Sequence, residues 1–227
     1  MSRPVLVGVA HGSHDPAAQR TARQLLAHVA ERSGVPVAPA FVQNAEPSLP
    51  AALAQAGPGA VVVPLLLSRG YHLSVDIARA ARAADAVVVP PLGPDPALTE
   101  ALAARLAEAG APAGVPVVLA AAGSSDPRAQ VDVERQAAQL GRRLGVPVVV
   151  GYASAASPTV GEAVAALSRE TGSSVAVATY LLGPGYFADA VARVPARWVA
   201  LPLGAHDAVV GLVLARYGSV VPAGLQP

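Results

Sequence analysis

The chain of 227 residues contains no cysteine and no lysine. The absence of cysteine excludes disulfides, thiolate nucleophiles and Cys-ligated metal or iron–sulfur sites. Because all 16 basic residues are arginines, a Schiff-base lysine and the lysine of a P-loop are excluded as well. ATP-driven chemistry of the P-loop type is therefore ruled out.

Aromatic residues make up only 4% of the chain, and its formal net charge is only +1. This charge gives no argument for nucleic acid or an anionic membrane as a partner. The apolar stretch near the N-terminus is too short for a signal peptide, and apolar runs such as AVVVPLLLS (60–68) fall far short of a membrane span. We expect a cytoplasmic protein with neither nucleic acid nor membrane as a partner.

Small aliphatic residues, by contrast, are abundant: hydrophobic residues make up 53% of the chain. Short apolar runs alternate with longer Ala-, Leu- and Arg-rich segments. In the first half this pattern predicts strands at 4–10, 35–42, 59–67 and 86–91, and helices at 16–34, 47–57, 73–84 and 95–110. Such alternation is typical of a parallel sheet covered by helices on both faces. We predict an open α/β fold of flavodoxin-like type with right-handed crossovers.

The second half of the sequence repeats the first. The segment PVLVGVAHGSHDP corresponds to VPVVLAAAGSSDP, and PLLLSRGYHLSVD corresponds to TYLLGPGYFADAV. His11 aligns with Ala122 at a separation of 111 residues, whereas His72 aligns with Phe187 at 115. We therefore predict an internal duplication, with a loop or strand that is four residues longer in the second half.

The duplication also predicts the domain organisation. The Ala-, Gly- and Pro-rich stretch EAGAPAGVP (108–116) separates the two copies. We expect an N-terminal half at 1–112, which carries His11 and His72, and a C-terminal half at 113–227, which lacks both. A single chain that holds two copies supplies both walls of a cleft, so both a monomer and a homodimer are compatible with the sequence.

Polar residues follow the predicted strands of the first half. His11 follows the first strand, Gln43 the second and His72 the third. In a flavodoxin-like sheet the first and third strands are neighbours at the switch point, so both imidazoles can face one crevice. Neutral imidazoles bind divalent transition metals and accept protons near pH 7. The second half keeps the surrounding Gly, Ser, Asp and Pro but not the histidines, which indicates that the histidines serve function rather than the fold.

Three segments carry a family resemblance. In order and spacing, AHGSHDP, AFVQNAEPSL and PLLLSRGYHLSVDI resemble the sirohydrochlorin cobaltochelatase/ferrochelatase family, the CbiX/SirB type of class II chelatases. That family inserts a divalent metal into a sirohydrochlorin-type tetrapyrrole without ATP or any nucleotide. The resemblance covers the whole chain and implies that His11 and His72 hold the incoming metal and help to remove the pyrrole N–H protons.

The resemblance further implies the substrates and their contacts. The metal, Co²⁺, Fe²⁺ or Ni²⁺, is a substrate, and all three tolerate imidazole ligands. The tetrapyrrole carries many carboxylates, for which Arg69, directly before GYH, is the best candidate partner. We assign Ser13 and Gln43 to substrate binding as well.

The chain departs from the family at the end of the second strand. Members usually have an acidic residue there, but this chain has Gln43, whose amide can ligate through oxygen but cannot accept a proton. Glu46, in the EPS turn, and His14, after HGS, are candidates for the missing base. Asp76 could orient His72 or cap the helix that follows.

Two other functions are compatible with the sequence. A non-catalytic carrier of metal or tetrapyrrole on the same fold would explain Gln43. A phosphohistidine enzyme of phosphoryl transfer is a more distant alternative, because it usually requires a cluster of arginines and a further histidine near the phosphate. A dinucleotide-binding domain is disfavoured, because no G-x-G-x-x-G follows a strand.

Overall fold

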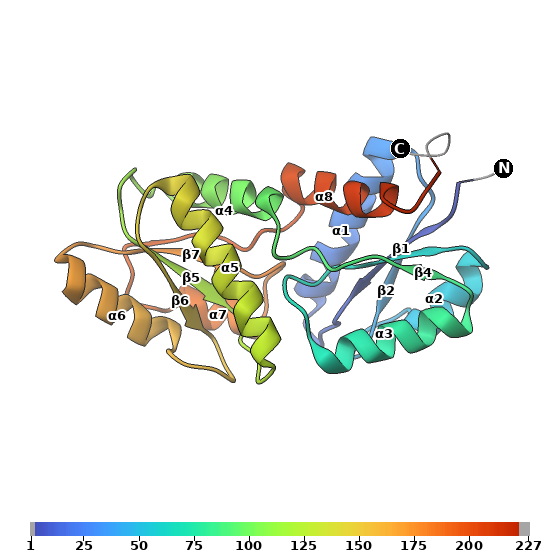
Figure 1. The fold of residues 1–227 in the computed structure, drawn as a ribbon, viewed down its shortest axis with the longest axis horizontal. Coiled ribbons are helices and arrows are strands. Elements are labelled where there is room, and N and C mark those ends of the chain that lie inside the picture. The colour runs from blue at the N-terminus through green and yellow to red at the C-terminus, as the bar shows by residue number, and fades with distance from the viewer. Residues whose placement is uncertain (1–2, 223–227) are drawn as a thin grey trace. The chain divides into compact units, whose positions relative to one another are not determined.

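The computed structural model describes residues 3–222, and the side chains of residues 71–74 lie outside the described part. Strands and helices alternate along the described residues from β1 to α8 (Figure 1). The chain forms two compact units, and each carries one parallel sheet. The α/β class and the two similar parallel-sheet halves predicted from the sequence are confirmed.

The first sheet has the order β2-β1-β3-β4, and every pair of neighbouring strands is parallel. The position of β1 between β2 and β3 makes the carboxyl ends of β1 and β3 neighbours, as a flavodoxin-like order requires. The bounds of the four strands are β1 (Leu6–Ala10), β2 (Val37–Phe41), β3 (Val61–Pro64) and β4 (Val87–Val88).

The second sheet repeats this arrangement in the order β6-β5-β7-β8, again with parallel neighbours only. Its strands are β5 (Val117–Ala121), β6 (Val148–Tyr152), β7 (Ala176–Tyr180) and β8 (Trp198–Val199). The duplication read from the sequence is therefore a duplication of the fold.

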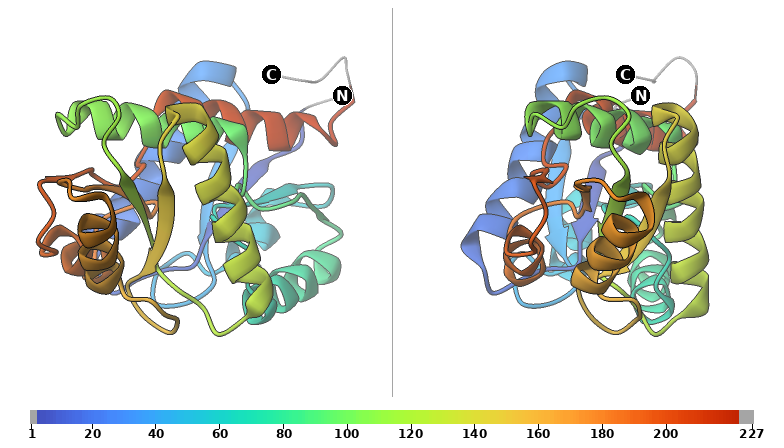
Figure 2. Two further views of the ribbon diagram at one scale, coloured as in Figure 1. Left: turned by 60° about the vertical axis from the view of Figure 1, so that its left-hand side comes forward. Right: turned by 90° about the vertical axis from the view of Figure 1, so that its left-hand side faces the viewer.

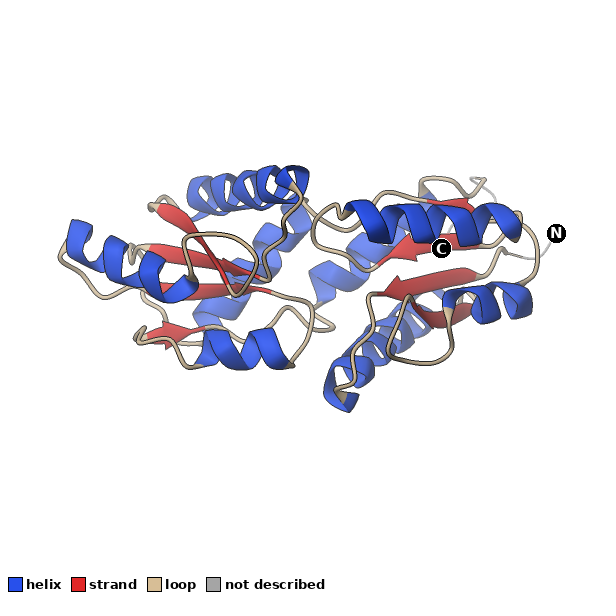
Figure 3. Cartoon of the chain, turned by 90° about the horizontal axis from the view of Figure 1, so that it is seen from below, coloured by secondary structure: helices blue, strands red, loops and turns tan. Residues whose placement is uncertain are grey.

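Helices lie on both faces of each sheet (Figure 3). Their ends follow sequence signals: Asp15 accepts the N–H of Ala17 at the start of the first helix, and Gly34, with φ +63°, ends it. Within residues 3–222, no helix has both the length and the apolar character that crossing a membrane requires. The helices are α1 (Pro16–Ser33), α2 (Leu49–Ala56), α3 (Tyr71–Ala83), α4 (Pro96–Glu108), α5 (Pro127–Leu144), α6 (Val160–Thr171), α7 (Tyr186–Ala192) and α8 (Asp207–Gly218).

The core of the first unit is built on the two faces of β1. On one face Val7 and Val9 pack in a buried cluster with residues of α2 and α3. On the other face Gly8 lies against α1, where a β-carbon would come within 2.3 Å of a methyl group of Leu26. The glycine therefore allows α1 to pack closely on the strand that His11 follows.

Two expectations about strand and loop lengths were wrong. The predicted strand at 86–91 is reduced to Val87 and Val88, which are 46% and 38% exposed. These residues form the edge of the sheet and pair on one side only, so apolar character alone did not indicate burial. The four extra residues of the second half extend a helix rather than a loop or strand: α2 has 8 residues and α6 has 12.

The compact units are divided differently from the sequence repeats. Of the described residues, 3–92 and 204–222 form one unit, and 93–203 form the other. Helix α4, at the end of the first repeat, packs on α5 and β7, whereas α8, at the end of the second, packs on α1 and β3 (Figures 1 and 2). The last helix of each repeat thus completes the other copy of the fold.

A polar layer joins α4 to α5. The fully buried Gln136 accepts the backbone N–H of Asp95 at 2.9 Å and donates to the hydroxyl of Thr99 at 2.7 Å. In the first unit the corresponding residues are Leu25 and Val210, which are also fully buried. Because a buried amide without partners is costly, this layer favours α4 over α8 as the partner of α5.

Candidate functional site

His11 directly follows Ala10, the last residue of β1, and is exposed at the carboxyl edge of the first sheet. The segments that follow β1 and β2 stay paired beyond the strands, because the N–H groups of Val42 and Gln43 donate to the carbonyls of Ala10 and His11 at 3.1 and 3.0 Å. This pairing fixes the backbone of His11 beside that of Gln43.

Gly12 makes this close approach possible. Its φ is +97°, and a β-carbon there would lie 1.6 Å from the carbonyl oxygen of Gln43. In the second unit Gly123 has φ +94°, and a β-carbon would lie 1.7 Å from the carbonyl oxygen of Ser154. The glycine of the HGS and AGS frames is therefore required by the fold in both copies.

The side chain of Gln43 contacts the imidazole of His11. The amide Nε2 lies 2.8 Å from the ring Nε2 of His11. At the equivalent place in the second unit, the hydroxyl of Ser154 donates to the carbonyl of Ala122 at 3.0 Å. The structure thus brings together two of the predicted site residues, and the contact has no counterpart in the second copy.

The environment of His11 favours a neutral imidazole. Although the residue is exposed, neighbouring protein displaces part of the water around its ring, and this desolvation lowers the pKa of His11 below 6.5. A neutral imidazole has a lone pair that can coordinate a metal ion or accept a proton.

Ser13 forms part of the turn that leads into α1. Its hydroxyl accepts the N–H of Asp15 at 3.0 Å, and its carbonyl accepts a hydrogen bond from Gln19 at 2.9 Å. The equivalent Ser124 makes the same two contacts at 3.1 and 3.0 Å. These local contacts explain why the serine recurs in both frames, while its assignment to substrate binding stays a prediction.

Glu46 has a structural role in the turn before α2. Its carboxylate accepts the N–H of Ser48 at 2.8 Å, and its carbonyl accepts a hydrogen bond from Arg23. The guanidinium of Arg23 lies over the ring of Phe41, 5.3 Å from the centroid. The carboxylate is thus engaged in holding the turn, while His14, the other candidate base, is exposed.

The loop after β3 and the start of α3 carry the other predicted site residues. Arg69 is exposed in this loop, directly before the N-cap residue Gly70. The backbone of His72 lies in the first turn of α3, but its side chain falls outside the described part of the structure. The shared crevice of His11 and His72 therefore stays a prediction.

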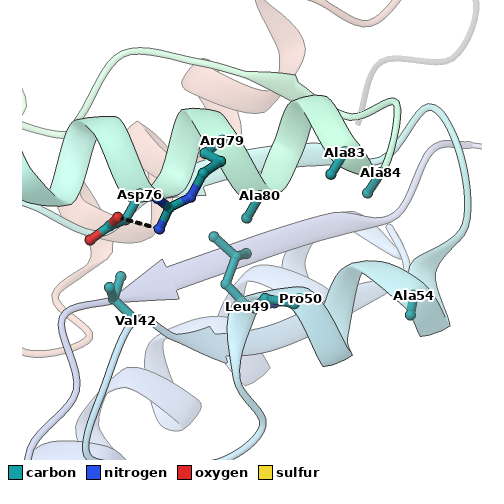
Figure 4. Close-up of a pocket in the computed structure, with 9 residues that line it drawn as sticks. All are labelled: Val42, Leu49, Pro50, Ala54, Asp76, Arg79, Ala80, Ala83 and Ala84. Atoms are coloured by element: carbon teal, nitrogen blue, oxygen red, sulfur yellow. Dashed lines mark hydrogen bonds and ion pairs between the residues drawn. The ribbon is translucent and has the colours of Figure 1, made fainter.

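Asp76 does not cap α3, and it forms an ion pair within the helix. It lies in the second turn of the helix, and its carboxylate pairs with Arg79 at 2.8 Å. Both residues line a cavity of about 640 Å³ between α2 and α3, whose other walls are mostly alanines with Val42 and Leu49 (Figure 4). Neither His11 nor Gln43 lines this cavity.

Among the side chains that the structure describes, no three of His, Cys, Asp or Glu are grouped closely enough to hold a metal ion. The predicted ligand pair has His72 as its second member, and that side chain is not among those described.

A comparison with models of protein families identifies the family of the chain. The model of the CbiX family matches residues 5–109 and, a second time, residues 116–220. The chain belongs to the CbiX family. Each match spans one copy of the repeat, so the resemblance found in the three motifs of the first half is confirmed for both halves. A comparison with curated proteins found no match.

Several solved structures share the fold. SirB from Bacillus subtilis with Fe³⁺ is 27% identical, with a TM-score of 0.77, and the match covers 95% of this chain and 94% of that one. The sirohydrochlorin chelatase SirB from B. subtilis subspecies spizizenii, in complex with cobalt, is 24% identical with a TM-score of 0.75 over 96% and 94% of the two chains. CbiX, described as the terminal enzyme for biosynthesis of siroheme in denitrifying bacteria, is 24% identical with a TM-score of 0.72 over 97% and 100%.

Proposed function

We propose that this CbiX family member inserts a divalent metal ion, Co²⁺ or Fe²⁺, into a sirohydrochlorin-type tetrapyrrole without ATP, with His11 and His72 as metal ligands and proton acceptors. The observation that carries the proposal is the position of His11. It is an imidazole with a lowered pKa at the carboxyl end of β1, beside β3, and it has no equivalent in the second copy of the same fold.

Comparison of the two copies distinguishes residues that the fold requires from residues that only function requires. Gly12 and Ser13 have equivalents with the same contacts in the second unit, so the fold accounts for them. His11 corresponds to Ala122, in a second sheet of the same order and register. The fold thus forms without the imidazole, which supports a chemical role for it.

The reaction suits these residues. Insertion replaces two pyrrole N–H protons by the metal ion, so the site must deliver a cation and accept two protons. A neutral imidazole can hold the ion through one nitrogen, and after transfer the same lone pair can take up a proton. Two imidazoles leave coordination positions open for the macrocycle, whereas a closed thiolate site would retain the metal.

Known structures of the family support the choice of metals. The two SirB structures hold Fe³⁺ and cobalt. The basic Arg69, exposed in the loop before α3, is suited to binding a carboxylate of the substrate.

The contact between Gln43 and His11 favours one alternative, a carrier that holds metal or tetrapyrrole without joining them. An amide at this place cannot accept a proton, which weakens the case for catalysis. The two functions differ in turnover. We expect the purified chain to convert many equivalents of metal-free sirohydrochlorin with Co²⁺ or Fe²⁺ in the absence of nucleotide, measured by the change in tetrapyrrole absorbance. Binding of metal or sirohydrochlorin without formation of the metallated product would indicate the carrier.

A further inference from the structure

The second unit exposes two aromatic side chains, Tyr186 and Phe187, although aromatic residues are rare in this chain. Tyr186 is 82% exposed and Phe187 38%, whereas Phe41, Tyr180 and Tyr217 are buried. The two exposed rings contact each other edge to face, with centroids 5.6 Å apart and planes at 70°. Their exposure therefore needs an explanation that the fold does not supply.

Both residues lie at the edge of the sheet where ligands bind in α/β folds. They are the first two residues of α7, which follows the carboxyl end of β7. The separation of 115 residues places Tyr186 and Phe187 at the positions of Tyr71 and His72 in the first copy. Where the first half carries a predicted metal ligand, the second half therefore carries an exposed aromatic ring.

A further apolar side chain lies at the same edge. Leu201 is 69% exposed and follows β8, the strand that pairs with β7. Of the four large apolar side chains exposed within residues 93–203, these three follow the carboxyl ends of neighbouring strands, and only Val131 lies elsewhere, on α5.

We propose that Tyr186 and Phe187 bind the flat face of a tetrapyrrole macrocycle at the carboxyl edge of the second sheet. This inference rests on the proposed function. A conjugated macrocycle presents a π-face to which aromatic rings pack in offset or edge-on geometry, and the Tyr186 hydroxyl can donate to a substrate carboxylate. Leu201 adds apolar area at the same edge.

The size of the exposed surface favours a small planar ligand over a protein. A stable protein interface buries about 800 Å² on each partner, from 20 or more residues a side. Three apolar side chains at one edge of the sheet are too few for such an interface, but they suffice to cover part of one macrocycle face.

The test is equilibrium binding of metal-free sirohydrochlorin to the full chain, without added metal. Trp198, the only tryptophan, provides an emission that a bound tetrapyrrole quenches. We expect Tyr186→Ala and Phe187→Ala each to raise the Kd by about 5- to 20-fold. Tyr186→Phe should raise it by no more than about 3-fold, since it loses only the hydroxyl contact. Val131→Ala, at an exposed position away from this edge, is the matched control and should leave the Kd unchanged.

The outcomes separate this inference from the function on which it rests. If the double variant Tyr186→Ala/Phe187→Ala binds the macrocycle as tightly as wild type while insertion continues, the inference is overturned and the function stands. A loss of affinity that Val131→Ala does not share supports it. If the variants change the oligomeric state in size-exclusion chromatography but not the Kd, the rings serve contact with a second copy and the inference fails. A wild-type chain that neither binds nor metallates sirohydrochlorin contradicts the proposed function itself.

Discussion

The Nε2 atom of His11 lies 2.8 Å from the side-chain Nε2 of Gln43, and the backbone N–H of Gln43 donates to the carbonyl of His11. The side chain that replaces the acidic residue expected from the family resemblance is therefore in direct contact with the predicted metal ligand. We therefore expect the chemistry of residue 43 to affect what His11 binds and when it is protonated.

Gln43→Glu should increase the affinity for the metal ion and shift the acidic limb of the insertion rate to higher pH. A carboxylate beside His11 adds negative charge for the cation and stabilises the imidazolium, so the pKa of His11 rises. We expect the metal concentration for half-maximal rate to fall and the acidic limb of the rate profile to move up by about one pH unit. Initial rates measured against metal concentration and pH test this, with Gln43→Ala as the control. An unchanged profile would show that residue 43 does not act on His11.

Glu46→Gln should leave insertion close to wild type. The Glu46 carboxylate accepts the N–H of Ser48 in the turn before α2, and an amide oxygen can accept the same bond. We expect a change in rate of less than about 2-fold and a loss of stability of less than about 1 kcal/mol. A large loss of rate with the fold intact would instead identify Glu46 as the proton acceptor, a role that the amide of Gln43 cannot fill.

His11 should titrate below 6.5 in the metal-free protein, because desolvation lowers its pKa. The folded chain then binds this proton more weakly than the unfolded chain, so the contribution of His11 to stability is fully present above pH 6.5 and is lost as pH falls below it. Imidazole chemical shifts followed by NMR, assigned with His11→Ala, measure the titration. A midpoint at or above 6.5 would contradict the described environment.

Gly12→Ala should destabilise the first unit strongly. The alanine would need φ near +97° and would place its β-carbon 1.6 Å from the Gln43 carbonyl oxygen. We expect a loss of about 3 kcal/mol or more. Gly114→Ala is the control, because φ is +81° there but the space around it is open, and it should cost about 1 kcal/mol. Chemical denaturation of both variants makes the comparison, and equal costs would contradict the close approach of the two backbones.

Gln136 and Thr99 should be energetically coupled. Gln136→Leu removes the buried amide that accepts the N–H of Asp95 and donates to the hydroxyl of Thr99 and should cost about 2–4 kcal/mol. In the double variant with Thr99→Val, part of this loss should be recovered, with a coupling energy of about 1 kcal/mol or more. A double-mutant cycle from denaturant unfolding measures it. If the stability losses of the two single variants simply add, Gln136 and Thr99 do not interact, and the polar layer does not favour α4 as the partner of α5.

Local signals in the sequence were sufficient for most of the fold. Asp15 and Gly34 mark the two ends of α1, and alternating apolar runs mark the strands, because capping and periodicity depend only on nearby residues. The switch point between β1 and β3 followed from the flavodoxin-like order. These rules alone place His11 at the carboxyl edge of the sheet.

The partners of α4 and α8 could not be predicted in the same way. Both helices have ordinary apolar patterns, and the sheet on which each one packs is decided by contacts far apart in the sequence. A signal was nevertheless present: Gln136 occupies the position where the first repeat has Leu25, and Thr99 the position where the second has Val210. At the candidate site, the position of Gln43 was predicted, but its contact with the imidazole depends on a side-chain conformation that sequence does not specify.

The most direct measurement is the initial rate of Co²⁺ or Fe²⁺ insertion into sirohydrochlorin by wild type, His11→Ala and His72→Ala, each with its unfolding midpoint. His28→Ala, on the exposed face of α1, is the control. We expect both site variants to lose about 100-fold or more in rate and to unfold near the wild-type midpoint, since the second copy of the fold carries Ala122 and Phe187 at these positions. A His11→Ala protein that is fully folded and inserts metal at the wild-type rate would contradict the account.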